Sequence, residues 1–336
     1  EKNKDENISK ISELTGVSTD YINTQISASY VKDDTFVPIK KVSADNTELK
    51  DKLLEIPGIK ITSVDARVYQ LGEEAAHLIG YVQNITAEEL EENRGKGYTS
   101  TSVIGKSGLE KEYEERLKGK DGVEIYIEDS EGNRKVDIAK IDVQNGEDIK
   151  LTIDSTIQMQ LYNELKDNEG FFVVMHPKTG ELLALVSTPS YNANDFSLGI
   201  SEEKWESLKN DKRKPLYSRY LATYTPGSTF KPIVGAIGIN NNYFSATDDF
   251  GASGTKWQND KSWKNLYVTT LEKYSEPANL ENALVYSDNI YFAKAAIKIE
   301  KENLKRNLEN IGFNEKIEFA QEIAQSTYGK IDSEPT

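Results

Sequence analysis

The spacing of hydrophobic and polar positions predicts a chain that mixes helices with strands. In residues 43–54, polar residues that favour helix N-termini precede apolar residues at helical spacing. Residues 87–92 are typical of the first turns of another helix, whereas residues 61–69 alternate hydrophobic and polar side chains as a strand does. These patterns favour an α+β fold for the first part of the chain.

The next stretch is patterned as strands separated by short turns rich in Gly and Asn. The three predicted strands cover residues 123–129, 134–143 and 148–154, with turns at Glu131-Gly132-Asn133 and Asn145-Gly146. No glycine-rich phosphate loop and no cluster of charged residues typical of an active site accompanies them. We therefore predict that residues 1–150 form an elongated, non-catalytic α+β domain.

From residue 154 the pattern becomes that of helices packed on a sheet. A helical segment, residues 155–166, leads into two apolar, β-rich runs within residues 170–187, which a Pro-Lys-Thr-Gly turn joins into a predicted buried hairpin. Residues 277–312 then predict two helical stretches separated by a polar triplet. We predict that residues 151–336 form a second domain.

Composition narrows the classes of function. The 336 residues carry a net charge of −15, and so acidic a surface repels phosphate backbones, which excludes nucleic acid as an expected partner. The chain has no cysteine, and its two histidines, His77 and His176, cannot build a zinc site without several carboxylates. We expect His77 to pack or to form hydrogen bonds within the first domain and His176 to lie in a loop, and we expect neither a metal nor a cofactor. No window approaches the roughly 18 consecutive apolar residues of a membrane-spanning helix.

The candidate chemistry begins with a serine and a lysine three residues apart. Ser228 and Lys231 follow Pro226-Gly227 at the start of an apolar helical run, so their side chains share one face of the predicted helix. A serine hydroxyl needs a neighbouring base to become a nucleophile, and burial favours the neutral lysine that can serve as one. Ser228 is thus a candidate nucleophile and Lys231 a candidate base.

Spacing alone is weak evidence for such a pair, because Ser-x-x-Lys also occurs at Ser201 to Lys204 and at Ser253 to Lys256. The first copy lies in a charged stretch and the second in a polar loop. A serine that caps a helix, followed by a solvated lysine, is the ordinary explanation of the spacing. Only Ser228 enters an apolar helix.

A second element strengthens the hypothesis, namely the triplet Ser287-Asp288-Asn289 in the break between two predicted helices. Ser287 and Asn289 can point to the same side of an extended turn. The hydroxyl can relay protons to a leaving amine, and the carboxamide can orient a lysine or bind a substrate amide. We interpret Asp288 as a turn residue.

Together these segments resemble the class B penicillin-binding proteins, which are serine D,D-transpeptidases of peptidoglycan synthesis. PGSTFK and YSDN match the first two active-site boxes of that family, and HPKTGELLALVSTPSYNANDF resembles its strand pair ahead of the nucleophile. ARVYQLGEEAAHLIGYV and VIGKSGLEKEYEERLKGKDG resemble its non-catalytic N-terminal region. WQNDKSW and DDTFVPIK resemble the low-affinity, β-lactam-resistant subgroup of Gram-positive bacteria, which implies slow acylation by penicillins.

The resemblance implies a fold and a set of roles. Residues 151–336 are expected to be the first part of an α/β/α transpeptidase sandwich. Ser228 would attack the penultimate D-alanine of a stem peptide, with Lys231 as base and the N–H of Ser228 as one oxyanion-hole donor. Ser287 would pass the proton to the leaving group, and Asn289 would hold the substrate and Lys231. A β-lactam would trap Ser228 as an acyl-enzyme.

The chain departs from the family in its third box, a Lys-(Thr/Ser)-Gly strand that should follow Asn289. Lys106-Ser107-Gly108 and Lys178-Thr179-Gly180 both precede Ser228, and we interpret them as chance matches because sheet strands are not simply reordered. We therefore expect a chain truncated at both ends, which lacks a membrane anchor and the rest of the catalytic domain and is inactive by itself. The expected location is the extracytoplasmic face of the membrane.

Two alternatives to a transpeptidase stay open. A β-lactam sensor or non-catalytic cell-wall scaffold would keep the fold, although the large first domain argues against a sensor. A D,D-carboxypeptidase would use water, in place of an amine, to resolve the acyl-enzyme, and the sequence does not separate it from a transpeptidase.

Overall fold

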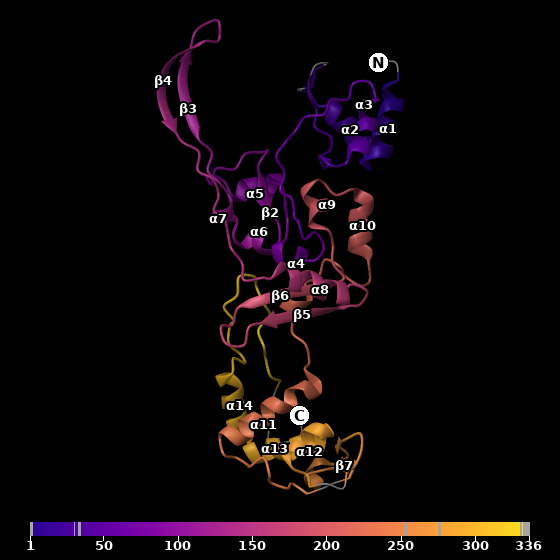
Figure 1. Ribbon diagram of the computed structural model, residues 1–336, viewed down its shortest axis with the longest axis vertical. Coiled ribbons are helices and arrows are strands. Elements are labelled where there is room, and N and C mark those ends of the chain that lie inside the picture. The colour runs from indigo at the N-terminus through magenta and orange to yellow at the C-terminus, as the bar shows by residue number, and fades with distance from the viewer. Residues whose placement is uncertain are drawn as a thin grey trace. The chain divides into compact units, whose positions relative to one another are not determined.

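The computed structural model describes residues 3–29, 31–32, 35–251, 254–274, 277–329 and 331 (Figure 1). The chain divides into two compact units, Glu1–Leu221 and Ala222–Thr336. This division falls later than the domain boundary that we placed at residue 150, and that functional boundary stays a prediction. Helices and strands are both present, so the predicted α+β class is confirmed.

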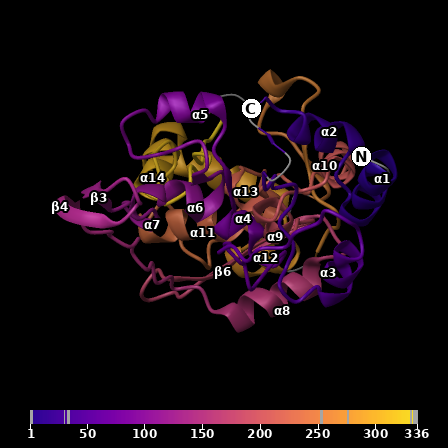
Figure 2. The ribbon, with the colours of Figure 1, turned by 90° about the horizontal axis from the view of Figure 1, so that it is seen from above.

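The first unit opens with a small helical cluster. Helix α1 (Lys4–Thr15) packs against both α2 (Thr19–Ile26) and α3 (Thr47–Leu54) (Figures 1 and 2). Helix α3 begins inside the predicted range of residues 43–54 because the Asn46 side chain accepts a hydrogen bond from the Leu49 N–H (3.1 Å).

Short elements continue the first unit. They are α4 (Ala76–Ile79), β1 (Val82–Asn84), α5 (Ala87–Glu92), β2 (Val103–Gly105), α6 (Gly108–Glu112) and α7 (Glu114–Leu117). Strands β1 and β2 pair antiparallel. Helix α5 has the predicted bounds, since Thr86 and Glu89 form a capping box in which each side chain accepts from the other residue's backbone N–H.

Of the strands predicted before residue 155, one pair is confirmed and two segments are wrong. Strands β3 (Val123–Glu128) and β4 (Arg134–Ile141) form the expected antiparallel hairpin, exposed along both strands. Neither residues 61–69 nor residues 148–154 form a strand, because within the described residues neither segment joins a β-ladder. A segment of alternating hydrophobic and polar side chains forms a strand only where a partner strand supplies hydrogen bonds.

The predicted helix and hairpin after residue 154 are confirmed. Helix α8 (Ser155–Leu165) is capped by the Asp154 side chain, and β5 (Gly170–Met175) pairs antiparallel with β6 (Leu182–Thr188). Helix α8 packs chiefly on β6. Strand β6 is therefore largely buried while most of β5 is exposed, so the hairpin is less buried than predicted.

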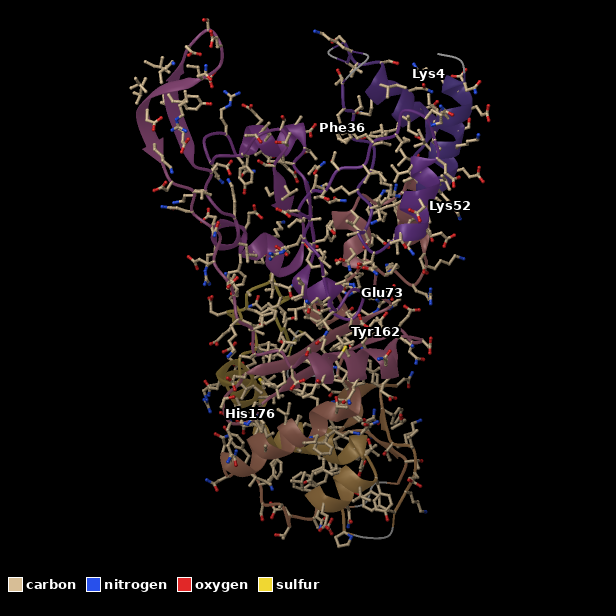
Figure 3. The ribbon with its side chains drawn as sticks, turned by 45° about the horizontal axis from the view of Figure 1, so that its top comes forward. Lys4, Phe36, Lys52, Glu73, Tyr162 and His176 are labelled. Atoms are coloured by element: carbon tan, nitrogen blue, oxygen red, sulfur yellow. The ribbon has the colours of Figure 1, made fainter. Side chains whose placement is uncertain are left out.

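Hydrogen bonds from α8 and a shared core join the segments on either side of this hairpin to the earlier part of the first unit. The buried Gln158 side chain donates to the carbonyls of Glu74 (2.7 Å) and Leu185 (2.8 Å). The Tyr162 hydroxyl donates to Glu73 (2.8 Å; both are labelled in Figure 3). One core cluster comprises Tyr69, Ala76, Tyr191, Ala193 and Phe196. The first unit therefore continues through α9 (Ala193–Ser197), α10 (Glu202–Asn210) and η1 (Arg219–Leu221).

His77 has the structural role that the sequence suggested. It is buried, and its Nε2 donates to the Pro215 carbonyl (2.9 Å). Burial lowers the pKa of His77 to about 4. The unfolded chain therefore gains a proton at His77 as the pH falls below about 6.5, while the folded chain resists protonation until about pH 4.

We predict that the first unit loses about 2 kcal/mol of unfolding free energy between pH 7 and pH 5 because of His77. Urea unfolding followed by Trp205 fluorescence, with Trp257 and Trp263 changed to phenylalanine, measures it. His77→Gln should be less stable at pH 7 and lose little more at pH 5. An equally steep pH dependence in that variant would place the proton uptake elsewhere.

In its described residues, the second unit consists of helices with one short strand pair. Its elements are η2 (Gly227–Phe230), α11 (Lys231–Asn240), β7 (Lys256–Trp257), η3 (Lys261–Trp263), β8 (Val268–Thr269), α12 (Leu280–Val285), α13 (Asn289–Ile299) and α14 (Lys301–Asn310). Its core comprises Ile237, Phe244, Ala278, Leu280, Ala283, Tyr291, Phe292, Ala295, Ile299 and Leu308. The hairpin of β5 and β6 belongs to the first unit, so the predicted sheet with its helices is divided between the two units.

The predicted pair of helical stretches in residues 277–312 is three helices. A first break lies at the polar triplet as predicted, and a second lies at Glu300, whose φ of 70° cannot continue a helix. In the part of the chain that the structure describes, no helix has both the length and the apolar character needed to cross a membrane.

Candidate active site

Ser228 lies in a tight turn directly before a partly buried helix. Gly227 begins the 3₁₀ turn η2 with a φ of 58°, a conformation that glycine adopts without strain. Ser228 is exposed in this turn, and α11 starts at Lys231 with Pro232 in its first turn. The turn brings Lys231 Nζ within 3.1 Å of Ser228 Oγ, as the spacing of the two residues predicted.

The Lys231 side chain is the centre of the site. Its residue is only 9% exposed, and Nζ donates to three oxygens: Ser228 Oγ (3.1 Å), Ser287 Oγ (2.9 Å) and the Ser287 carbonyl (2.6 Å). Burial lowers the pKa of Lys231, and the negative charge of Asp288 partly opposes that effect. The neutral amine, which can accept a proton, is thus more accessible than in a solvated lysine.

Ser287 reaches Lys231 because α12 ends in a Schellman motif. The N–H of Ser287 bonds to the Leu284 carbonyl (3.2 Å), and that of Asp288 bonds to the Ala283 carbonyl (2.8 Å). Ser287 occupies the left-handed position, with a φ of 50°, where glycine is usual. Both Ser287 oxygens that bond Lys231 depend on this conformation.

Asp288 is more than the turn residue that we expected. It is buried, and its Oδ1 accepts from the Ile290 N–H (2.8 Å) as the N-cap of α13. Its Oδ2 accepts from the Tyr274 hydroxyl (2.9 Å). Neither contact was expected from the sequence. An aspartate directly before an apolar helical run was the available signal for the cap, but nothing in the sequence indicated Tyr274.

Asn289 lies on the exposed side of the break. Its Nδ2 donates to the Thr269 carbonyl of β8 (2.9 Å). Among the hydrogen bonds of the described residues, none joins Asn289 to Lys231, so the expected contact with the lysine is replaced by one with β8. The structure thus brings Ser228, Lys231 and Ser287 together, with Asn289 beside Asp288 at the start of α13.

The competing motifs have ordinary structural roles in the first unit. Ser201 caps α10 and accepts from the Lys204 N–H (3.3 Å). Lys106 pairs with Glu89, and Thr179 lies in the hairpin turn, where its N–H donates to His176 Nδ1 (3.2 Å). Ser253 of the third Ser-x-x-Lys copy lies outside the described residues, as do Asp33 and Asp34 of the DDTFVPIK segment.

The arrangement of Ser228, Lys231 and Ser287 supports nucleophilic catalysis by a serine. Among the described residues, no three His, Asp or Glu side chains gather as a metal site would require. An exposed hydroxyl, a buried lysine and a second hydroxyl form one hydrogen-bonded chain. Such a chain can remove a proton from Ser228 and deliver it to a leaving group.

Comparison with protein families gives two matches. Residues 1–151 match the penicillin-binding protein dimerisation domain, and residues 170–334 match the penicillin-binding protein transpeptidase domain. The two matches cover most of the chain, and the second contains all four candidate site residues.

Curated relatives match along almost the whole chain. Penicillin-binding protein 3 of Bacillus subtilis is 41% identical over 333 residues, which cover 98% of this chain and 49% of that protein. The peptidoglycan D,D-transpeptidase MrdA of Acinetobacter baumannii is 29% identical over 317 residues, which cover 93% of this chain and 46% of that protein. The chain therefore spans about half the length of these relatives.

Solved structures agree with these matches. A complex between a penicillin-binding protein (PBP2) and MreC from Helicobacter pylori has a TM-score of 0.71 at 27% identity and covers 94% of this chain and 59% of that chain. Pseudomonas aeruginosa PBP2 in complex with WCK 5153 has a TM-score of 0.64 at 31% identity, with 76% and 52% covered.

Proposed function

The chain belongs to the penicillin-binding proteins, and from this membership we propose that its protein is a peptidoglycan D,D-transpeptidase that works through an acyl-serine intermediate. The observation that supports the proposal most directly is the position of Lys231 Nζ, which is within hydrogen-bonding distance of Ser228 Oγ and Ser287 Oγ at once. A single buried amine can then take a proton from the nucleophile and hand it on.

In the first half-reaction, Ser228 Oγ forms a bond to the carbonyl carbon of the penultimate D-alanine of a stem peptide. The proton of Ser228 moves to Lys231 Nζ as the bond forms. The C–N bond to the terminal D-alanine breaks, and the departing amine receives a proton through Ser287 Oγ. D-alanine leaves, and the peptide stays on Ser228 as an ester.

In the second half-reaction, an amine of a neighbouring stem peptide attacks that ester. The amine loses a proton, the new amide bond forms, and Ser228 Oγ leaves and regains its proton by the same chain of groups. We assign Asn289 to substrate binding, since its side chain is exposed at the start of α13 beside this chain of groups. The amide carbonyl of Asn289 can accept a hydrogen bond from the peptide backbone.

Partners and location follow from the same proposal. The substrates are peptidoglycan stem peptides that end in D-alanyl-D-alanine, and β-lactams mimic that end and acylate Ser228. Because its substrates lie outside the cytoplasm, we place the protein at the extracytoplasmic face of the membrane and expect the whole protein to be anchored there. Slow acylation by penicillins and a Gram-positive source stay predictions, based on the WQNDKSW and DDTFVPIK segments.

The test uses the protein as its own gene encodes it, incubated with stem peptides that carry an acceptor amine. We expect cross-linked dimers together with the release of one D-alanine per bond formed, and covalent labelling of Ser228 by a fluorescent penicillin. Mass spectrometry of the products separates dimers from trimmed monomers.

Other outcomes would select the alternatives. D-alanine release without dimers, at saturating acceptor, would indicate a carboxypeptidase. Labelling of Ser228 without turnover of any peptide would indicate a sensor or scaffold. No adduct on Ser228 after long incubation at high penicillin concentration would rule out the acyl-serine mechanism.

A further inference from the structure

The side chain of Tyr274 contacts both neighbours of Ser287. Its hydroxyl donates to Asp288 Oδ2 (2.9 Å), so it is tied to the residue that follows Ser287. Its ring stacks on Tyr286, the residue that precedes Ser287, with ring centroids 4.6 Å apart and planes within 6°. Tyr274 lies in the segment between β8 and α12 and belongs to neither helix that meets at Ser287.

The two contacts act on a backbone position that needs support. Ser287 has a φ of 50°, in the left-handed region where a side chain is strained relative to glycine. Tyr286 ends α12 and Asp288 caps α13, so the turn is fixed at both ends only while these residues keep their places. A strained backbone conformation of this kind persists when several surrounding contacts hold it in place.

We propose that Tyr274 is a positioning residue for the proton relay: its hydroxyl holds Asp288 and its ring holds Tyr286, which together keep both Ser287 oxygens on Lys231. The role of Tyr274 in the proton relay rests on the proposed function. Its role in maintaining the turn at Ser287 does not depend on any reaction.

The charges around the turn fit this role. Burial and the hydrogen bond to Asp288 raise the pKa of Tyr274, so its hydroxyl stays a donor at neutral pH. Burial lowers the pKa of Lys231 on α11 and of Lys294 on α13, and the negative charge of Asp288 partly opposes that effect at each lysine. Among the described residues, Asp288 is the charged group that shifts the pKa of Lys231. The uncharged ring of Phe292 on α13 also faces Lys231 Nζ.

The variant Tyr274→Phe keeps the ring and removes the hydroxyl. We expect acylation of Ser228 by a fluorescent penicillin to slow about tenfold, and the amide protons of Asp288 and Ile290 to exchange with solvent at least about tenfold faster. Both amides donate within the turn, to the Ala283 carbonyl and to Asp288 Oδ1. Amides of α14 should exchange as before.

Asp288→Asn tests the same contact from the other side, because asparagine can still cap α13 but carries no charge. Its acylation should depend on pH with a midpoint shifted to lower pH, since the charge that raises the pKa of Lys231 is gone. In the double variant, Tyr274→Phe should slow acylation by clearly less than tenfold relative to Asp288→Asn alone, because the two residues act through one hydrogen bond.

Tyr267→Phe is the matched control, because it removes an exposed tyrosine hydroxyl from the same unit. It should change neither acylation nor amide exchange. Unchanged exchange at Asp288 and Ile290 in Tyr274→Phe would overturn the inference whether or not the protein acylates. Faster exchange with unchanged acylation would restrict Tyr274 to the stability of the turn and likewise refute its role in the relay. Wild-type protein without any adduct would instead overturn the proposed function.

Discussion

Replacing Ser228 with alanine is expected to abolish covalent labelling by penicillin, a loss of at least about 10³-fold in the acylation rate, because no other group can form the ester. Ser228 is exposed in its turn, so the stability of the fold should change by no more than about 0.5 kcal/mol. The measurement is labelling with fluorescent penicillin on the protein as its own gene encodes it, with the melting temperature recorded in parallel.

Ser201→Ala is the matched control, because Ser201 has the same spacing to a lysine but caps α10. It should cost about 1 kcal/mol of stability through the lost cap and leave acylation unchanged. Stable labelling of Ser228→Ala at the wild-type rate would show that the nucleophile is another residue, and peptide mapping of the adduct would identify it.

Replacing Lys231 is expected to slow acylation by about 10²–10⁴-fold, the usual contribution of a general base. Lys231→Met removes the amine, whereas Lys231→Arg keeps a positive charge that cannot be lost near neutral pH. Acylation should slow to the same extent in both variants if the neutral amine of Lys231 acts as the base. In the wild type, acylation should rise with pH as Lys231 loses its proton, over a range that burial moves below the ordinary pKa of lysine.

Second-order rate constants measured from pH 6 to pH 10 test this prediction. The rise with pH should disappear in both variants. Lys204→Met, at the matching position after Ser201, should retain the wild-type profile. If Lys231→Arg kept near wild-type acylation, the lysine would serve as a positive charge, and the base would have to be sought elsewhere.

The local part of this site could be predicted from the sequence. Ser228 and Lys231 are three residues apart where η2 leads into α11, so their contact depends on local backbone geometry that the spacing specifies. The same holds for α5 and α8, whose caps, Thr86 and Asp154, are adjacent in sequence to the turns that they stabilise.

Contacts between distant segments could not be predicted in this way. Ser287 meets Lys231 only because α11 packs on α13, and that association follows from side-chain packing across long sequence separation. The Tyr274 contact joins two irregular segments that have no periodic pattern. The failed strand at residues 61–69 shows the converse error, since its alternating Val64 and Val68 are exposed and pair with nothing among the described strands.

The left-handed serine at the end of α12 has an evolutionary consequence. Glycine would adopt the φ of 50° at position 287 without strain, so selection for a stable scaffold alone favours glycine there. If Ser287 has the proposed role in the relay, selection for its hydroxyl is what we expect to keep a serine at this position. We therefore expect position 287 to separate relatives kept for the reaction from those kept for the scaffold alone.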